Sequence, residues 1–537
     1  MTKASPGTFL ASGLLCVALS ISSLATAQPI ASLAPEIQVA IGTPGFDFPY
    51  SMATAADGDI LVAGTADSAG GRRSSPAYGG EDFVLWRLDK NLAVRWDQSF
   101  GGNANDRMFD IAEDSKGNIL VVGRSLSPVS GNKSAAGLGG NDYWAVLTDR
   151  NGQKLWERTF GGDGDDRCFG VLRLPTDDFV LVGSSASLPN TVAGGKRLPN
   201  YGGADVYAVC IGNNGVQKWE ACFGGAADDT CRSAVLLANG TIVLVGYSYS
   251  APGGWANKTT ALVGFVDIWC IGIDVNGRQL WQSGHGKADQ YLSADTRGAT
   301  ATPDGGFLVA TSRTNPAGDP ADPATVWQSE GLLLKFDAAG KLQSTRHYPN
   351  PSAGRNPSQE ALNGVHFGRV MRLQGGGYLV GGLTDSAAGG FQLEPTHGMN
   401  DVVVLQLDDS LEPVASAVLG GTSNEWGPAL SQLPDGHLCV ALQSYSGVGG
   451  NKTVPAYGSL DSWLLTMSPY VQDSIRIFAA VELQFKTQLG QRYQLAHSSD
   501  LTSWVPQGPV FAGTGTTTTN LVSILGTQAR YWKLLRL

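Results

Sequence analysis

The 537-residue sequence is poor in charge, cysteine and histidine. Charged residues make up 16% of it, and 47 acids against 37 bases give a net charge of −10. This charge argues against a nucleic-acid partner, because binding the phosphate backbone requires a basic surface. The seven cysteines contain no CxxC pair and no zinc-type spacing. The sequence also lacks a Ser-His-Asp elbow, an HExxH motif and a phosphate loop.

Long apolar runs are missing after residue 24. A polar start with Lys3, an apolar run over residues 9–24 and an Ala25-Thr26-Ala27 string predict an export signal at residues 1–27. An uncleaved anchor is the alternative interpretation. No later stretch approaches the roughly 18 apolar residues of a spanning helix. We therefore expect a secreted, periplasmic or cell-surface protein with no membrane span. In such a compartment Cys222 and Cys231 could form a disulfide, or the cysteines could simply fill space in strands.

Helical periodicity is also missing, and a repeat of about 60 residues takes its place. A clear copy contains Asp142 in the string GGNDYW, then Trp156, an FGG turn, Asp166 and the apolar run FVLVG. The acid that opens each unit recurs at intervals between 60 and 71 residues, as Asp82, Asp142, Asp205, Asp267, Glu330, Asp401 and Asp461. Each unit holds four short apolar runs bounded by Gly, Asn and Asp, which predict four strands. A four-stranded unit at this period is typical of a propeller blade.

The ends of the repeat region predict how the ring closes. The first unit lacks its opening strand and begins at Ile37, whereas the last unit stops after Leu465. Together they make one blade. We therefore predict an all-β fold in which residues 36–471 form a seven-bladed β-propeller of four-stranded blades, closed by N- and C-terminal strands. Residues 28–35 are expected to be a linker.

The pattern GGxDxWxxxxDxxGxxxWxxxFGGxxxD…GGxxLVGxS resembles the long-repeat β-propellers of secreted and surface proteins of bacteria. The resemblance covers about residues 36–471 and implies the fold, but no particular activity. The units between residues 312 and 398 depart most from the pattern, with Thr345 where a tryptophan is expected.

Residues 472–537 do not continue the repeat. The strings GQRYQL (490–495), SSDLTSW (498–504) and RYWK (530–533) resemble a small C-terminal β-sandwich domain of exported proteins from verrucomicrobia and related bacteria. The resemblance implies a module that binds glycan, associates with the envelope or caps the propeller. Its aromatic residues Tyr493, Trp504 and Trp532 could form a sugar platform or pack in a core.

A second acidic position follows the FGG turn, at Asp47, Asp106, Asp166, Asp229, Asp289 and Glu425. We place the opening acids where the outer strand of one blade passes to the inner strand of the next. Two rings of carboxylates should then surround one end of the channel. They could collect calcium, which takes six to eight oxygen ligands, or they could accept backbone N–H bonds at turns. The second interpretation makes a structural acid ring of Asp82, Asp142, Asp205, Asp267, Glu330, Asp401, Asp461, Asp106, Asp166 and Asp229.

Basic residues recur ahead of the opening acids, as Arg73, Lys133, Lys196, Lys258 and Lys452. They could form a cationic ring for an anionic polymer. We favour the view that they neutralise the nearby acids at the surface, where such pairs contribute little.

Irregular loops are the best guide to a ligand site, because binding residues are grafted onto a regular fold at loops. The fifth unit carries an insertion over residues 348–364. The candidate ligand-binding residues near it are Arg346, His347, Arg355, Glu360 and His366. The leading hypothesis is an exported, monomeric, non-catalytic protein that binds a glycan, an envelope polymer or a protein on the loop-rich face. The alternative is a polysaccharide-active hydrolase or lyase with its site in the fifth-unit loops. No cofactor is expected, with calcium as the possible exception.

Overall fold

The computed structural model describes residues 30–288, 291–292, 298–315, 328–349, 364–386, 388–470, 480–486, 488–498, 503–512, 517–523 and 531–537. Every regular element in this part of the chain is a strand, so the predicted all-β class is confirmed. No helix here is long and apolar enough to cross a membrane. The described residues divide into two compact units, one ending at Tyr470 and the other beginning after it.

The described residues of the first unit form seven sheets, which we number in chain order and which are antiparallel except where β1 joins sheet 6 in parallel. Sheets 1 to 3 contain β3 (Asp47–Thr54), β4 (Ile60–Ala66), β5 (Asp82–Leu88) and β6 (Val94–Phe100); β7 (Asp106–Glu113), β8 (Ile119–Ser125), β9 (Asp142–Thr148) and β10 (Lys154–Phe160); and β11 (Asp166–Arg173), β12 (Phe179–Ser185), β13 (Asp205–Ile211) and β14 (Gln217–Phe223).

Sheets 4 to 7 continue the pattern, with short additional strands. They contain β15 (Asp229–Leu236), β16 (Ile242–Ser248), β17 (Asp267–Ile273) and β18 (Gln279–His285); β19 (Tyr291–Leu292), β20 (Ala299–Ala301), β21 (Phe307–Asn315), β22 (Gln328–Phe336) and β23 (Leu342–Tyr348); β24 (Val365–Arg372), β25 (Tyr378–Thr384), β26 (Asp401–Leu407), β27 (Pro413–Leu419) and β1 (Ala31–Ser32); and β28 (Glu425–Gln432), β29 (Leu438–Ser444), β30 (Asp461–Met467) and β2 (Pro35–Ile41).

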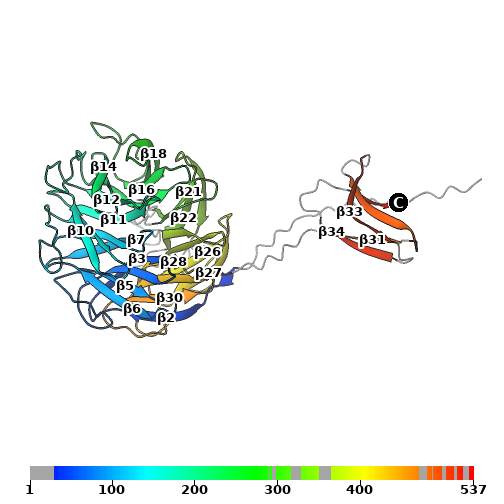
Figure 1. The fold of residues 1–537 in the computed structure, drawn as a ribbon, viewed down its shortest axis with the longest axis horizontal. Coiled ribbons are helices and arrows are strands. Elements are labelled where there is room, and N and C mark those ends of the chain that lie inside the picture. The colour runs from blue at the N-terminus through cyan, green and yellow to red at the C-terminus, as the bar shows by residue number, and fades with distance from the viewer. Residues whose placement is uncertain are drawn as a thin grey trace, which may run out of the picture. The chain divides into compact units, whose positions relative to one another are not determined.

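These sheets are arranged around a common centre. β3 contacts β7, β7 contacts β11, and the contacts continue through β15, β20, β24 and β28 back to β3. The colours in Figure 1 follow the same order around the ring. The strands nearest the centre are therefore β3, β7, β11, β15, β20, β24 and β28. We call each of them the first strand of its sheet, and the unit has the architecture of a β-propeller.

The two ends of the unit meet in sheet 7. β2 pairs with β30, so that Ala40 lies opposite Trp463, and Figure 1 shows the blue β2 beside the orange β30. This is the pairing that the incomplete first and last units predict. The segment expected to be a linker is partly strand, because Ala31 and Ser32 pair in parallel with Ala415 and Ser416 of β27.

The core lies between neighbouring sheets. All seven residues of β13 are buried, as expected for strands covered on both faces. Aromatic rings bridge the sheets: the rings of Phe83 in sheet 1 and Trp144 in sheet 2 have centroids 4.7 Å apart. The hairpin between β9 and β10 forms because Asp149 accepts the N–H of Asn151 at 2.8 Å, while Gly152 adopts a positive φ of 80°.

The strand pairing corrects the expected position of the opening acids. Asp82 begins β5 and Asp142 begins β9, so these acids open the third strand of a sheet and do not lie at the crossing to the next sheet. That crossing carries the second acids, such as Asp106 at the start of β7. A sequence repeat shows its period but not its phase, whereas hydrogen bonding between strands decides where each sheet begins.

The second unit contains two small sheets. One pairs β31 (Ala480–Lys486) with β34 (Thr517–Ser523), and the other has the order β33 (Val505–Ala512), β32 (Arg492–Ser498), β35 (Tyr531–Arg536). Tyr493 is buried, with its ring centroid 6.1 Å from that of Phe511. Tyr493 therefore packs in a core and is not part of an exposed sugar platform.

Candidate functional site

The repeated acids lie at one end of the channel in buried pairs, as Asp142 and Asp166 illustrate. Asp142 Oδ2 accepts the N–H of Leu138 at 2.7 Å. Asp166 Oδ2 accepts the N–H of Gly162 at 2.8 Å and the hydroxyl of Ser187 at 2.7 Å. A Cβ on Gly161 would lie 2.8 Å from Asp142 Oδ1 and 2.3 Å from Asp166 Oδ2. The FGG turn therefore requires glycine, because the two carboxylates close around it.

Other opening acids make the same bond to the N–H four residues earlier. The acceptor and donor residues are Asp82 and Tyr78, Asp205 and Tyr201, Asp267 and Val263, Asp401 and His397, and Asp461 and Tyr457. Asp106 and Asp229 repeat the bonds of Asp166, to Gly102 and Ser127 and to Gly225 and Ser250. Glu330 differs, because it forms an ion pair with Arg313.

Burial raises the pKa of Asp47, Asp142, Asp205 and Asp401 to about 7, and a nearby second acid adds to the effect in each pair. Within the described residues, no group of three or more His, Cys, Asp or Glu is arranged to hold a metal ion. The hydrogen bonds of the described paired acids stabilise the turns.

The expectation that the recurring basic residues lie at the surface is wrong. Lys133, Lys196, Lys258 and Lys452 are each at most 2% exposed. Lys196 Nζ donates to the carbonyl of Ser187 at 3.1 Å and lies 5.6 Å from the ring centroid of Tyr207. Arg73 forms a fully buried ion pair with Asp82 at 3.0 Å. These cations balance the buried acids from within, so they are not available to an anionic polymer.

Sheet 6 replaces the lysine by Gln392, which is also buried. Its amide donates to the carbonyls of Ser386 and Glu394, both at 2.9 Å, and its carbonyl accepts from Thr384 at 2.9 Å. The polar contacts are kept, but the acids of this sheet have no local cation at that position.

The three described candidate ligand-binding residues of the fifth unit do not lie on one strand or in one sheet. Arg346 and His347 lie on β23, the outer strand of sheet 5, where Arg346 pairs with Glu412 and His347 Nδ1 lies 3.3 Å from Glu330 Oε1. Arg355 and Glu360 fall outside the described residues. His366 lies on β24, the first strand of sheet 6. Ion pairing on an outer strand therefore accounts for Arg346 and His347.

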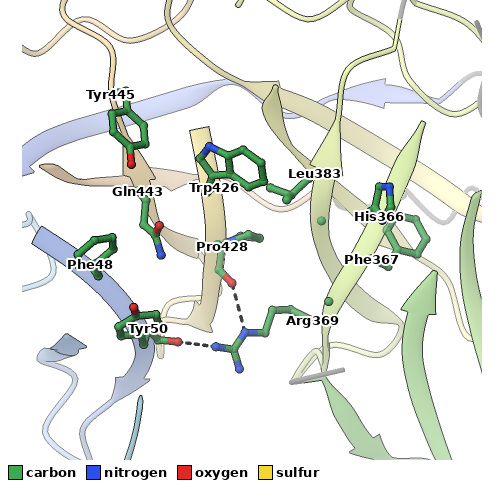
Figure 2. A pocket seen from close by; sticks show the side chains of 13 residues that line it. Phe48, Tyr50, His366, Phe367, Arg369, Leu383, Trp426, Pro428, Gln443 and Tyr445 are labelled. Atoms are coloured by element: carbon green, nitrogen blue, oxygen red, sulfur yellow. Dashed lines mark hydrogen bonds between the residues drawn. The ribbon is translucent and has the colours of Figure 1, made fainter. Parts of the chain in front are cut away.

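His366 instead lines a cavity of about 450 Å³ (Figure 2). The cavity lies beside the repeated acids, because its lining residues Phe48 and Trp426 directly follow Asp47 and Glu425. The walls come from the first and second strands of sheets 6 and 7 and from the first strand of sheet 1. The lining residues are Phe48, Tyr50, His366, Phe367, Gly368, Arg369, Gly382, Leu383, Trp426, Gly427, Pro428, Gln443 and Tyr445.

Arg369 forms one wall of this cavity and is held by backbone carbonyls. Its Nε donates to Pro428 O at 3.3 Å, and its Nη2 donates to Tyr50 O, as the dashed lines in Figure 2 show. The same side chain lines a second cavity of about 100 Å³, together with Ser51 and Met52. Its positive charge also lies near Asp110, whose pKa is raised by burial and lowered in part by this arginine.

The cavity offers aromatic faces and hydrogen-bonding groups from separate strands. Trp426 and Phe48 supply flat apolar surface, while Gln443 and Tyr445 supply an amide and a hydroxyl. Tyr445 is 44% exposed and therefore accessible from solvent. Concave sites that combine apolar walls with a few polar groups are typical of small-ligand binding.

Apart from His366, the lining residues were not predicted from the sequence. One signal was present. The second residue of the first strand changes from unit to unit, as Phe48, Arg107, Arg167, His366 and Trp426, whereas the position before it is acidic in all but one of these strands. A position that varies between the units, next to one that stays nearly constant, marks a surface where the units of this protein differ from one another.

No protein-family model and no curated protein matches this sequence. Among solved structures, a protein of unknown function from Dyadobacter fermentans has 13% identity and a TM-score of 0.42, covering 82% of this chain and 100% of its own. A GH93 α-L-arabinofuranosidase of Fusarium graminearum has 11% identity and a TM-score of 0.36, covering 66% of this chain and 91% of its own. The NanB sialidase from Streptococcus pneumoniae has 11% identity and a TM-score of 0.36, covering 84% and 73%.

Proposed function

We propose that this chain is an exported, monomeric, non-catalytic binding protein that captures a glycan in the cavity at the acid-bearing end of the channel. In this proposal the seven sheets are the blades of one seven-bladed ring, and the second unit is a small β-sandwich. The observation that carries the proposal is the cavity itself, with aromatic and hydrogen-bonding side chains from sheets 1, 6 and 7 around one space of about 450 Å³.

A glycan suits this combination of groups. A pyranose ring has apolar C–H faces that stack on aromatic rings, and hydroxyl groups that bond to amides and to a phenol. Trp426, Phe48 and Tyr445 supply the rings, and Gln443 supplies an amide. The hydrolase alternative required the fifth-unit residues to converge, but Arg346 and His347 lie on an outer strand, apart from His366.

A glycan-array screen of the mature chain tests the proposal, with Trp426→Ala as the key variant. For each glycan that the parent chain binds, we expect the variant to bind at least about tenfold more weakly or not at all, because a central aromatic contact contributes about 2 kcal/mol or more. Trp255→Ala is the matched control, since Trp255 is 97% exposed in the loop between β16 and β17. Binding that survives Trp426→Ala but fails with Trp255→Ala would move the site out of the cavity. Turnover of a retained glycan would contradict the non-catalytic assignment.

A further inference from the structure

The cavity walls use two equivalent positions of each sheet. One is the second residue of the first strand, His366 in sheet 6 and Trp426 in sheet 7. The other is the penultimate residue of the second strand, Leu383 in sheet 6 and Gln443 in sheet 7. Because the sheets repeat around the centre, the same positions in sheets 2 and 3 belong to the same end of the channel.

In sheet 2 both positions are arginine. Arg107 on β7 and Arg124 on β8 lie directly opposite each other in the strand register. The first position of sheet 3 is Arg167 on β11, a strand that contacts both β7 and β8. We call Arg107, Arg124 and Arg167 the arginine cluster. Like charges in a cross-strand pair are destabilising, so this arrangement requires compensation.

Two members of the arginine cluster are compensated within the protein. Glu81 accepts hydrogen bonds from both Nε and Nη2 of Arg107. Asp165 accepts from Arg167 Nε at 2.6 Å. The guanidinium group of Arg124 has no hydrogen bond or ion pair with a side chain of any residue that the structure describes, although its backbone pairs with both neighbouring strands. Burial lowers the pKa of Arg124, the charges of Arg167 and Arg107 lower it further, and the charges of Asp165 and Glu81 raise it in part.

The arginine cluster is accessible and adjoins the cavity. The side chains of Arg107 and Arg167 are 34% and 45% exposed. Sheet 1, which supplies Phe48 and Tyr50, packs directly on sheet 2. The ring of Tyr50 lies 5.1 Å from that of Phe109, the second residue after Arg107, so the two sites are continuous along the channel wall.

We propose that the arginine cluster binds the carboxylate or sulfate group of an acidic polysaccharide whose neighbouring sugar ring occupies the cavity. This inference rests on the proposed function and names its ligand class. Asp165 and Glu81 act on Arg124 only from a distance, and an anion between the guanidinium groups would be its direct partner. Guanidinium suits this task because its planar donors match the oxygens of carboxylate and sulfate groups.

Isothermal titration calorimetry of the mature full chain tests the proposal with four tetrasaccharides. Tetragalacturonate carries carboxylates, its methyl ester is the neutral counterpart, a sulfated galactan tetramer carries sulfate esters, and unsulfated galactan is its neutral counterpart. We expect at least one acidic member to bind about tenfold or more tightly than its neutral counterpart. The member that does so identifies the anionic group.

Arg124→Gln should remove this preference and leave binding of the neutral tetramer unchanged. Trp426→Ala should weaken both. The control Arg95→Gln changes an arginine on β6 that pairs with Asp59 at 2.9 Å and is 53% exposed, and it should change neither. Melting followed by circular dichroism shows whether Arg124→Gln folds, while the comparison of acidic and neutral ligands needs no variant.

The outcomes separate the two proposals. Equal affinity for acidic and neutral members, or an acidic preference that survives Arg124→Gln, overturns the arginine site. If a neutral tetramer still binds and its binding requires Trp426, the proposed function stands without the arginine site. If none of the four tetrasaccharides binds, the acidic-ligand inference is overturned, and the array screen decides the proposed function by itself.

Discussion

The buried carboxylate pairs make the stability of this protein dependent on pH. Burial raises the pKa of Asp142 to about 7, whereas the same group in the unfolded chain titrates near 4. Between these values the folded state holds a proton that the unfolded state has released. The free energy of unfolding should therefore fall as pH rises from about 4 to 7, and it should be flat above that range for this group.

Asp142→Asn should flatten this part of the pH profile. The asparagine carbonyl still accepts the N–H of Leu138 but carries no charge, so we expect the variant to lose less stability between pH 5 and 8 than the parent. Asp142→Ala should cost about 1–3 kcal/mol at pH 5, because it leaves that N–H unpaired. Chemical denaturation at both pH values measures the effect, with the exposed Asp163→Asn as control. A steeper profile for Asp142→Asn would contradict the assignment.

The buried lysines should matter most when the acids are ionised. Lys196→Met keeps most of the side-chain volume but leaves Asp166 and Asp205 without their nearby cation. We expect a loss of about 3 kcal/mol at pH 8 and a clearly smaller loss at pH 5, because the pKa of Asp205 is raised to about 7 and this acid is then protonated. Denaturant titration measures both. The same substitution at Lys218, whose side chain is 50% exposed, should have little effect at either pH.

At the residue scale, the sequence predicted that the acids accept backbone N–H bonds at turns, but it did not predict that the lysine side chains are buried. Asp142 lies four residues after its N–H donor, and such a local turn contact is visible in the sequence. Lys196 is buried against the carbonyl of Ser187 and the ring of Tyr207, and no local pattern reveals this packing. A lysine close to an acid in the sequence predicts an ion pair at the surface, because exposed pairs are far more common than buried ones.

At the scale of the elements, the ring depends on one strand contributed by the N-terminal end. β2 is the outer strand of sheet 7, although its residues lie more than 400 positions before their partners on β30. Each of the other sheets takes its four main strands from one continuous segment. When β2 pairs with β30, the chain loses a large conformational entropy, because this one strand pair closes a loop of more than 400 residues.

A disulfide across this pair should stabilise the protein. Ile37 lies opposite Thr466 in the register, and Ile37 is 37% exposed. We expect the oxidised Ile37→Cys/Thr466→Cys variant to gain about 4 kcal/mol over its reduced form, because the cross-link closes a very long loop. Unfolding with and without reductant measures the gain, and each single cysteine variant is a control. Failure to form the bond in the folded protein would contradict the observed pairing.

The strands themselves were readable from the sequence, because each is a short apolar run between turn residues. The phase of the sheets was not, because Asp142 opens a third strand and only the bonds between β8 and β9 show this. The period of the repeat can be read along the chain, whereas the strand that begins each sheet is set by the hydrogen bonds between strands.

At the scale of the whole molecule, no strand that the structure describes in one unit pairs with a described strand of the other. Tyr470 still belongs to the first unit, since its backbone N–H and carbonyl bond to Gln406 at 2.8 and 2.7 Å. A chain ending at Tyr470 should therefore melt within about 2 °C of the corresponding transition of the full chain. Calorimetry measures this, and a chain ending at Leu460, before β30, is expected not to fold. A large fall in melting temperature for the longer truncation would show that the units stabilise each other.

The sequence by itself determined the all-β class, the repeat, the turn acids and the meeting of the two chain ends. All of these depend on neighbours in the chain or on a regular period. The tertiary structure decided the cavity and the arginine cluster. Phe48, His366 and Trp426 come from strands separated by up to about 380 residues. They line one cavity only because their strands meet around a common centre. No short stretch of the sequence shows that these strands meet.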